Sequence, residues 1–147
     1  MRLQRREMFD CPTPDAAAIP RRKQVLVVDD DATILDLLAT FLTRLGYDVW
    51  RAADGSIALD LFRRISFDLV ITDLAMPVMD GYTLCTKISG LAATTPVVVV
   101  TGRVDFTPEQ AACLTTAVEV MVKPFDLKRL KAVVEGALAT RLKAASI

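Results

Sequence analysis

Polar side chains stand directly after four apolar segments of the chain. The segments and the residues that follow them are Val25–Val28 with Asp29, Asp30 and Asp31, Asp68–Thr72 with Asp73, Val97–Val100 with Thr101, and Val118–Val122 with Lys123. Carboxylates that converge in one cleft repel each other and need a cation, and oxygen ligands without His or Cys favour Mg²⁺. A lysine and a hydroxyl beside them would bind an anion, and a phosphoryl group is the anion that normally accompanies Mg²⁺. These residues therefore predict a phosphoryl–Mg²⁺ site, provided that the segment ends meet.

The elements that must bring them together follow from the hydrophobic pattern. Strands are predicted at Val25–Val28, Tyr47–Arg51, Asp68–Thr72, Val97–Thr101 and Val118–Val122. Amphipathic helices are predicted after Asp31, Asp54, Gly81, Thr107 and Asp126. This alternation predicts an α/β fold with a sheet of parallel strands and right-handed crossovers. Ligands of such sheets bind at the carboxyl ends of the strands.

Helical spacing predicts which sides of the first two helices face the core. The predicted inward residues are Ile34, Leu37, Leu38, Phe41, Leu42 and Leu45 in the first helix, and Ile57, Leu61, Phe62 and Ile65 in the second. Taken singly, the polar residues also have structural interpretations. Asp31 is a natural helix cap, and Asp29 or Asp30 would serve as a solvated turn residue.

The composition excludes several classes of site. The chain has 147 residues, the size of one domain, and its 18 basic and 18 acidic residues give a formal net charge of zero. It contains no histidine, which excludes a Ser-His-Asp triad, a Cys-His pair, a His-containing zinc site and a phosphohistidine of its own. Its three cysteines are odd in number and widely spaced, as expected of reduced thiols in a cytoplasmic protein.

Three regions are expected along the chain. Residues 1–23, with three prolines and scattered charge, predict a flexible arm, residues 24–143 a folded domain, and residues 144–147 a tail. No apolar run is long enough to span a bilayer, and the N-terminus lacks the apolar region of a signal peptide, so no membrane contact is expected. Bases interspersed with prolines and acids make a poor surface for phosphates, so no direct DNA binding is expected.

Four motifs together resemble the receiver domain of two-component response regulators, in particular the stand-alone, chemotaxis-regulator-like type. The motifs are Val25-Leu26-Val27-Val28-Asp29-Asp30-Asp31, Asp68-Leu69-Val70-Ile71-Thr72-Asp73-Leu74-Ala75-Met76-Pro77-Val78-Met79-Asp80-Gly81, Val97–Val100-Thr101-Gly102 and Val122-Lys123-Pro124-Phe125. The resemblance covers about residues 24–143, with the order and spacing of the family. It implies the flavodoxin-like strand order 2-1-3-4-5.

The resemblance also implies a role for each matching residue. The expected Mg²⁺ ligands are Asp29, Asp30, Asp73 and the backbone carbonyl of Ala75. Asp73 is the expected phosphoacceptor, Lys123 the cation that pairs with the phosphoryl group, and Thr101 the hydroxyl that closes onto it. The Lys123–Pro124 peptide is expected to be cis. Pro77 and Gly81 are expected to shape the loop after the phosphoacceptor.

The implied function is signalling, and catalysis is limited to the protein's own phosphorylation and dephosphorylation. The expected donor is the phosphohistidine of a histidine kinase or histidine phosphotransfer protein. The expected output is contact with a downstream protein through the face of the fourth helix, fifth strand and fifth helix. The family usually has an aromatic residue three positions before the lysine, where this chain has Val120. Coupling through an aromatic rotamer at that position is therefore in question.

Two other functions fit part of the pattern. A receiver-like docking module would bind a partner without being phosphorylated, and Val120 keeps this alternative open. The Asp29-Asp30-Asp31-Ala32-Thr33 stretch also fits the D-x-D-x-T signature of haloacid dehalogenase-type phosphatases, with Asp29 as nucleophile and Asp31 as general acid. Against the phosphatase, its last acidic motif should follow the lysine, whereas Asp73 precedes it. That family also normally inserts a flap where a helix is predicted here.

Overall fold

Five strands and five helices make up the part of the chain that the computed structural model describes, namely residues 21–92, 94–102, 105–114 and 117–145. The strands are β1 (Gln24–Val28), β2 (Asp48–Ala52), β3 (Leu69–Thr72), β4 (Val97–Thr101) and β5 (Ala117–Val122), and the helices are α2 (Ala32–Arg44), α3 (Gly55–Arg64), α4 (Gly81–Leu91), α5 (Pro108–Cys113) and α6 (Leu127–Ala145). Residues 1–20 of the expected arm and 146–147 of the expected tail lie outside the described residues. None of the described helices is long and apolar enough to cross a membrane.

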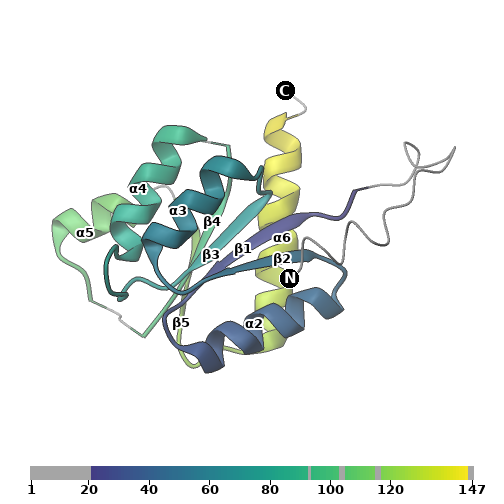
Figure 1. Ribbon diagram of the computed structural model, residues 1–147, viewed down its shortest axis with the longest axis horizontal. Helices are drawn as coiled ribbons and strands as arrows, with labels where there is room; N and C mark the ends of the chain where they lie inside the picture. The colour runs from purple at the N-terminus through teal and green to yellow at the C-terminus, as the bar shows by residue number, and fades with distance from the viewer. Residues whose placement is uncertain (1–20, 93, 103–104, 115–116, 146–147) are drawn as a thin grey trace, which may run out of the picture.

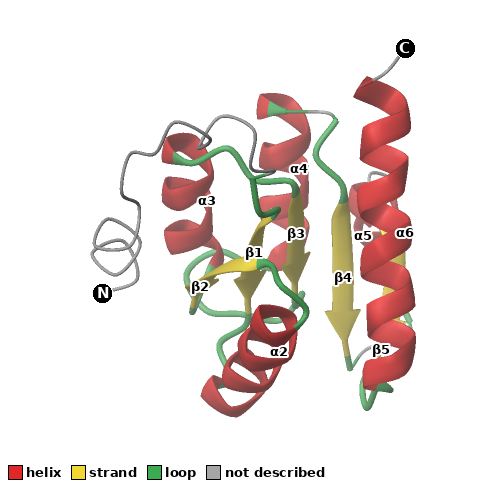
Figure 2. Ribbon diagram, turned by 90° about the vertical axis from the view of Figure 1, so that its right-hand side faces the viewer, coloured by secondary structure: helices red, strands yellow, loops and turns green. Residues whose placement is uncertain are grey.

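The strands lie in the order β2-β1-β3-β4-β5, and all four neighbouring pairs are parallel. Helices cover both faces of the sheet (Figure 1 and Figure 2). Helices α2 and α6 pack on one face, α3 and α4 pack on the other, and α5 lies beside α4. The predicted α/β fold with strand order 2-1-3-4-5 is therefore confirmed.

Strands β1 and β4 are buried along their whole length, which explains why their sequences are apolar without alternation. Successive side chains of β1 enter opposite layers of the core. Val25 and Val27 pack with α2 and α6, whereas Leu26 and Val28 pack with α3 and α4. Asp29 follows this strand, which is covered by helices on both faces of the sheet.

Side-chain caps determine where helices begin beside the strand ends. The Asp31 carboxylate accepts hydrogen bonds from the backbone N–H groups of Thr33 (2.9 Å) and Ile34 (3.4 Å) at the start of α2. Thr107 and Gln110 form a reciprocal capping box at the start of α5. These contacts satisfy N–H groups that have no partner within the helix, and they agree with the predicted helix starts.

Two side chains predicted to face the core lie on the surface instead. Leu37 is 42% exposed and Ile57 is 47% exposed, so both predictions are wrong. The buried stripe of α2 runs through Leu38 and Leu42. Successive helical residues are about 100° apart, so this stripe turns Leu37 away from the sheet. Hydrophobic spacing gave the helix but not its rotation about its axis.

Polar contacts join three strands at the amino end of the sheet. The indole N–H of Trp50 in β2 donates a hydrogen bond to Oε1 of Gln24 in β1 at 2.9 Å. The backbone N–H of Gln24 donates to the carboxylate of Asp68, just before β3, at 2.8 Å. This group lies at the opposite end of β1 from Asp29.

The two described cysteines should differ in reactivity. Cys85 in α4 is fully buried, and burial raises the pKa of its thiol to about 12, whereas Cys113 in α5 is half-buried. Because the thiolate is the reactive form, we expect iodoacetamide at about pH 8 to modify Cys113 in the folded protein and to spare Cys85. Peptide mass mapping with and without urea measures both sites. Equal labelling without urea would contradict the buried position of Cys85.

Candidate functional site

Two buried carboxylates meet where β1 and β3 end. These strands are neighbours with Val28 in register with Thr72, so Asp29 and Asp73 follow adjacent strand ends. Asp29 is 1% exposed and Asp73 is 8% exposed, whereas Asp30 beside them is exposed. One carboxylate oxygen from each of the three lies within 4.8 Å of the others. The structure thus brings together the three acids that the sequence singled out.

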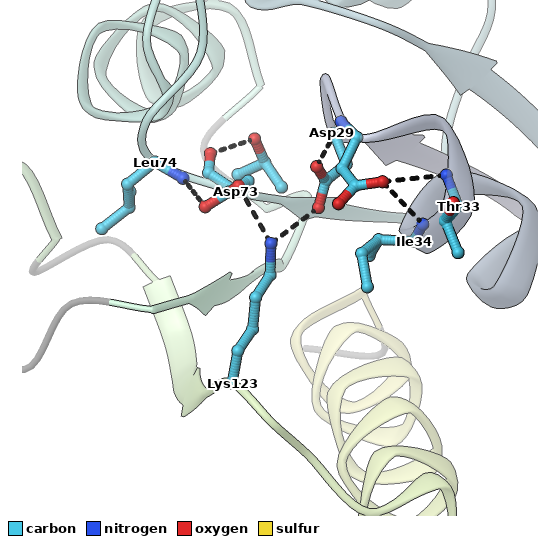
Figure 3. Close-up of polar contacts among 8 residues, drawn as sticks. Asp29, Thr33, Ile34, Asp73, Leu74 and Lys123 are labelled. Atoms are coloured by element: carbon cyan, nitrogen blue, oxygen red, sulfur yellow. Dashed lines mark hydrogen bonds and ion pairs between the residues drawn. The ribbon is translucent and has the colours of Figure 1, made fainter.

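Lys123 supplies a positive charge between two of these acids. From the end of β5, its Nζ lies 3.0 Å from Oδ2 of Asp29 and 3.1 Å from Oδ2 of Asp73 (Figure 3). Burial lowers the pKa of Lys123, but the hydrogen bonds and charges of both carboxylates outweigh it and hold the pKa above its ordinary value. The ammonium group therefore stays charged and offsets the repulsion between the acids.

Asp29 has both carboxylate oxygens engaged. Its Oδ1 accepts a hydrogen bond from the backbone N–H of Asp31 at 2.9 Å, and its Oδ2 accepts from Lys123. Burial raises the pKa of Asp29, and these two hydrogen bonds counteract the rise only in part. Because Asp31 also caps α2, the start of that helix and the orientation of Asp29 are determined together.

The main chain around Asp73 is held from two sides. The N–H of Leu74 donates to Oδ1 of Asp73 at 2.7 Å, and the Thr72 hydroxyl donates to the Asp73 carbonyl at 2.8 Å. Gly81, the first residue of α4, lies so close that a Cβ there would overlap the same carbonyl and approach Cα of Leu74 to 2.8 Å. The sequence carries no signal for the Thr72 contact, because threonine is an ordinary strand residue.

Thr101 and Ala75 lie at the same edge of the sheet. Thr101 ends β4, between β3 and β5, and is 1% exposed. Its backbone carbonyl accepts a hydrogen bond from the N–H of Lys123 at 2.7 Å. Ala75 is exposed in the loop that follows Asp73. The Lys123–Pro124 peptide is cis, as the resemblance to receiver domains implied.

The loop between β3 and α4 contains a strained turn. Val78 has a φ of 68°, and the N–H of Met79 donates to the Pro77 carbonyl at 2.7 Å across it. A β-branched residue in this conformation costs about 1–3 kcal/mol, and the Val78 side chain is 84% exposed. The far end of the turn is fastened to α3, because Gly55 donates its N–H to the Met79 carbonyl at 3.1 Å. A Cβ on Gly55 would come within 2.5 Å of that oxygen.

The close approach of α4 to Asp73 can be tested with two glycines of the same helix. We expect Gly81→Ala to lower the free energy of unfolding by about 1–3 kcal/mol, because the added methyl group displaces α4 from Asp73. At Gly90 a Cβ has no neighbour within 4 Å, so Gly90→Ala should raise the free energy of unfolding by about 0.5–1 kcal/mol. Urea unfolding measures both. Similar effects of the two substitutions would contradict the packing.

Comparison with known proteins gives one family. The family model described as "Response regulator receiver domain" matches residues 25–135. The chain is 36% identical over 126 residues to "Probable transcriptional regulator ycf27" of Porphyridium aerugineum, a match that covers 86% of this chain and 52% of the relative. It is also 36% identical over 115 residues to "Transcriptional regulatory protein ZraR" of Escherichia coli K12, covering 78% of this chain and 26% of that one. The chain thus spans about half the length, or less, of these relatives.

Solved structures agree with the family match. A CheY-like receiver domain protein from Methanospirillum hungatei superimposes with a TM-score of 0.79 at 28% identity, covering 84% of this chain and 99% of that one. The response regulator TrrA from Thermotoga maritima, in complex with Mg²⁺ and BeF, gives a TM-score of 0.70 at 30% identity, covering 78% and 98%. With its sheet order, its acidic cluster and these matches, the chain belongs to the response regulator receiver domain family.

Proposed function

We propose that this receiver domain takes a phosphoryl group from a partner's phosphohistidine onto Asp73 in a Mg²⁺-dependent reaction. The observation that carries the proposal is the position of Lys123, whose ammonium bridges Asp73 and Asp29 while three carboxylate oxygens converge beside it. Such a site attracts a phosphoryl group and a cation at the same time. Family membership and the TrrA complex with Mg²⁺ and BeF support the same chemistry.

The donor atoms fit Mg²⁺. Asp29, Asp30 and Asp73 offer hard oxygen ligands, and the exposure of Asp30 leaves room for the water molecules that Mg²⁺ retains. The resemblance to receiver domains implies the Ala75 backbone carbonyl as a further ligand, and we include it in the proposed site. When bound, the ion would neutralise charge on the phosphoryl oxygens and on the three acids.

The protein's own groups then have separate tasks in the transfer. A carboxylate oxygen of Asp73 forms the bond to phosphorus as the bond from phosphorus to the donor imidazole breaks, and the imidazole leaves. Lys123 moves its charge from the Asp73 carboxylate to the phosphoryl oxygens and remains anchored by Asp29. Thr101 donates its hydroxyl to a phosphoryl oxygen. The held backbone of Asp73 keeps the nucleophile in line, and such positioning carries most of phosphoryl-transfer catalysis.

The proposed partners are proteins. The donor is a histidine kinase or a histidine phosphotransfer protein, and the output is contact of α5, β5 and α6 with a downstream protein in the cytoplasm. Within this surface, Val118 and Val122 of β5 are 43% and 44% exposed. Arg129 of α6 forms an ion pair with Glu119 of β5 at 2.7 Å. We propose no DNA or membrane contact for residues 24–143.

The geometry weighs against the phosphatase alternative. Asp29, its required nucleophile, is less exposed than Asp73. Asp31, its required general acid, caps α2 with its carboxylate. The more accessible carboxylate next to the lysine is Asp73. We therefore place the nucleophile on Asp73.

Intact mass after incubation with acetyl phosphate tests the proposal. We expect the wild type to gain one phosphoryl group with Mg²⁺ and none with EDTA, and Asp73→Asn to gain none, because an amide is a poor nucleophile. Asp80→Asn is the matched control. Asp80 caps α4 in the same loop and asparagine caps equally well, so this variant should label like the wild type.

Other results would point to the alternatives. No adduct on the wild type would support a docking module that is not phosphorylated. Label or turnover that persists in Asp73→Asn but is lost in Asp29→Asn would support the phosphatase.

Metal binding can be measured without a phosphoryl donor. At Mg²⁺ concentrations tenfold above the dissociation constant, the free energy of unfolding should rise by about 1.4 kcal/mol. We expect Asp30→Asn to lose most of this rise because a ligand charge is removed. Asp31→Asn keeps the helix cap and should respond like the wild type. Thermal unfolding with and without Mg²⁺ measures the effect, and an unchanged response of Asp30→Asn would exclude it as a ligand.

A further inference from the structure

An aromatic contact connects α4 with Phe106, two residues before α5. The rings of Tyr82 and Phe106 meet edge to face, with centroids 6.4 Å apart and planes at 77°. We propose that this contact couples the backbone of Asp73 to α5, so that the state of the acceptor is passed to the surface through Tyr82 and Phe106. The inference rests on the function proposed above and concerns how that function is regulated.

The first link joins Asp73 to Tyr82. Tyr82 follows Gly81, which has no free space against the carbonyl of Asp73 and Cα of Leu74. The N–H of Gly81 also donates to the Leu74 carbonyl at 2.9 Å. A shift of the Asp73 backbone therefore moves the first turn of α4, because close-packed atoms transmit displacement.

The second link joins Phe106 to α5. Phe106 directly precedes Thr107, whose capping box with Gln110 ties it rigidly to the first turn of α5. Helix α5 has no buried residue of its own between Pro108 and Cys113. Half-buried Phe106, packed edge to face on Tyr82, is therefore one of the contacts that hold α5 against α4. An element with few buried apolar residues has the low local stability expected of one that moves.

Val120 does not offer a competing side-chain route. It lies in β5 and packs in the same apolar cluster as Tyr82 and Phe106. A β-branched side chain has restricted χ1 angles and no ring to swing between buried and exposed positions. Passage of a signal through the Tyr82–Phe106 contact requires no such rotamer change.

Hydrogen–deuterium exchange of the full chain, with and without Mg²⁺ and beryllofluoride, tests the coupling. In the wild type, beryllofluoride should change deuterium uptake both in the loop after Asp73 and in Pro108–Cys113. In Phe106→Ala the change in the loop should remain. The change in α5 should fall to less than about half, since one aromatic contact is worth about two- to twelvefold in an equilibrium.

Two further variants separate coupling from general destabilisation. Phe106→Leu keeps an apolar side chain but removes the ring, and it should lose the α5 response as Phe106→Ala does. Phe62→Leu removes a ring from the stacked Phe62–Phe67 pair, whose centroids are 6.2 Å apart; Phe67 precedes the amino end of β3, whereas Asp73 follows its carboxyl end. This control should keep the α5 response.

The outcomes distinguish this inference from the function on which it rests. A full α5 response in both Phe106 variants would overturn the coupling. So would a wild type in which beryllofluoride changes the loop after Asp73 but not α5. Neither result would contradict the proposed function. Loss of the α5 response in Phe62→Leu as well would assign the effect to stability and also overturn the coupling. A wild type that neither responds to beryllofluoride nor forms the acetyl phosphate adduct would instead overturn the proposed function.

Discussion

One ammonium group between two buried carboxylates is the interaction on which the site depends. Asp29 is almost fully buried, and an uncompensated charge there would cost several kcal/mol, so its ionised form requires Lys123. The two residues are 94 positions apart and come from strands separated by β3 and β4. The ion pair therefore forms only when β1, β3, β4 and β5 are assembled. The same assembly brings Asp73 to the other side of the ammonium.

Around this charge, the loop after Asp73 is fastened at several points instead of being free. Gly81 and Gly55 allow α4 and α3 to touch its backbone, and their N–H groups hold the carbonyls of Leu74 and Met79. These contacts explain how the strained conformation of Val78 persists. The same contacts connect the loop after Asp73 to α3 and α4, so a change in the loop would be felt by both helices.

Much of this could be predicted from the sequence because it depends on local patterns. The apolar run Val25–Val28 and its following acids identify a buried strand and its functional end. The outward Leu37 could not be predicted, because the rotation of α2 depends on its packing against α6 and the sheet. The Tyr82–Phe106 contact was likewise invisible, since it depends on how two separate segments meet in space. The spacing of residues along the chain predicts helices, strands and the strand ends. Contacts between aromatic rings can be seen only in the folded structure.

Trp50, the one tryptophan of the chain, bonds to Gln24 at the amino end of β1, whereas Asp29 follows the carboxyl end of that strand. Its indole thus joins β2 to the first residue of β1. Fluorescence from this ring should accordingly follow the pairing of β1 with β2, and hence the integrity of the sheet. Unfolding of the sheet can therefore be followed by the emission of a single side chain.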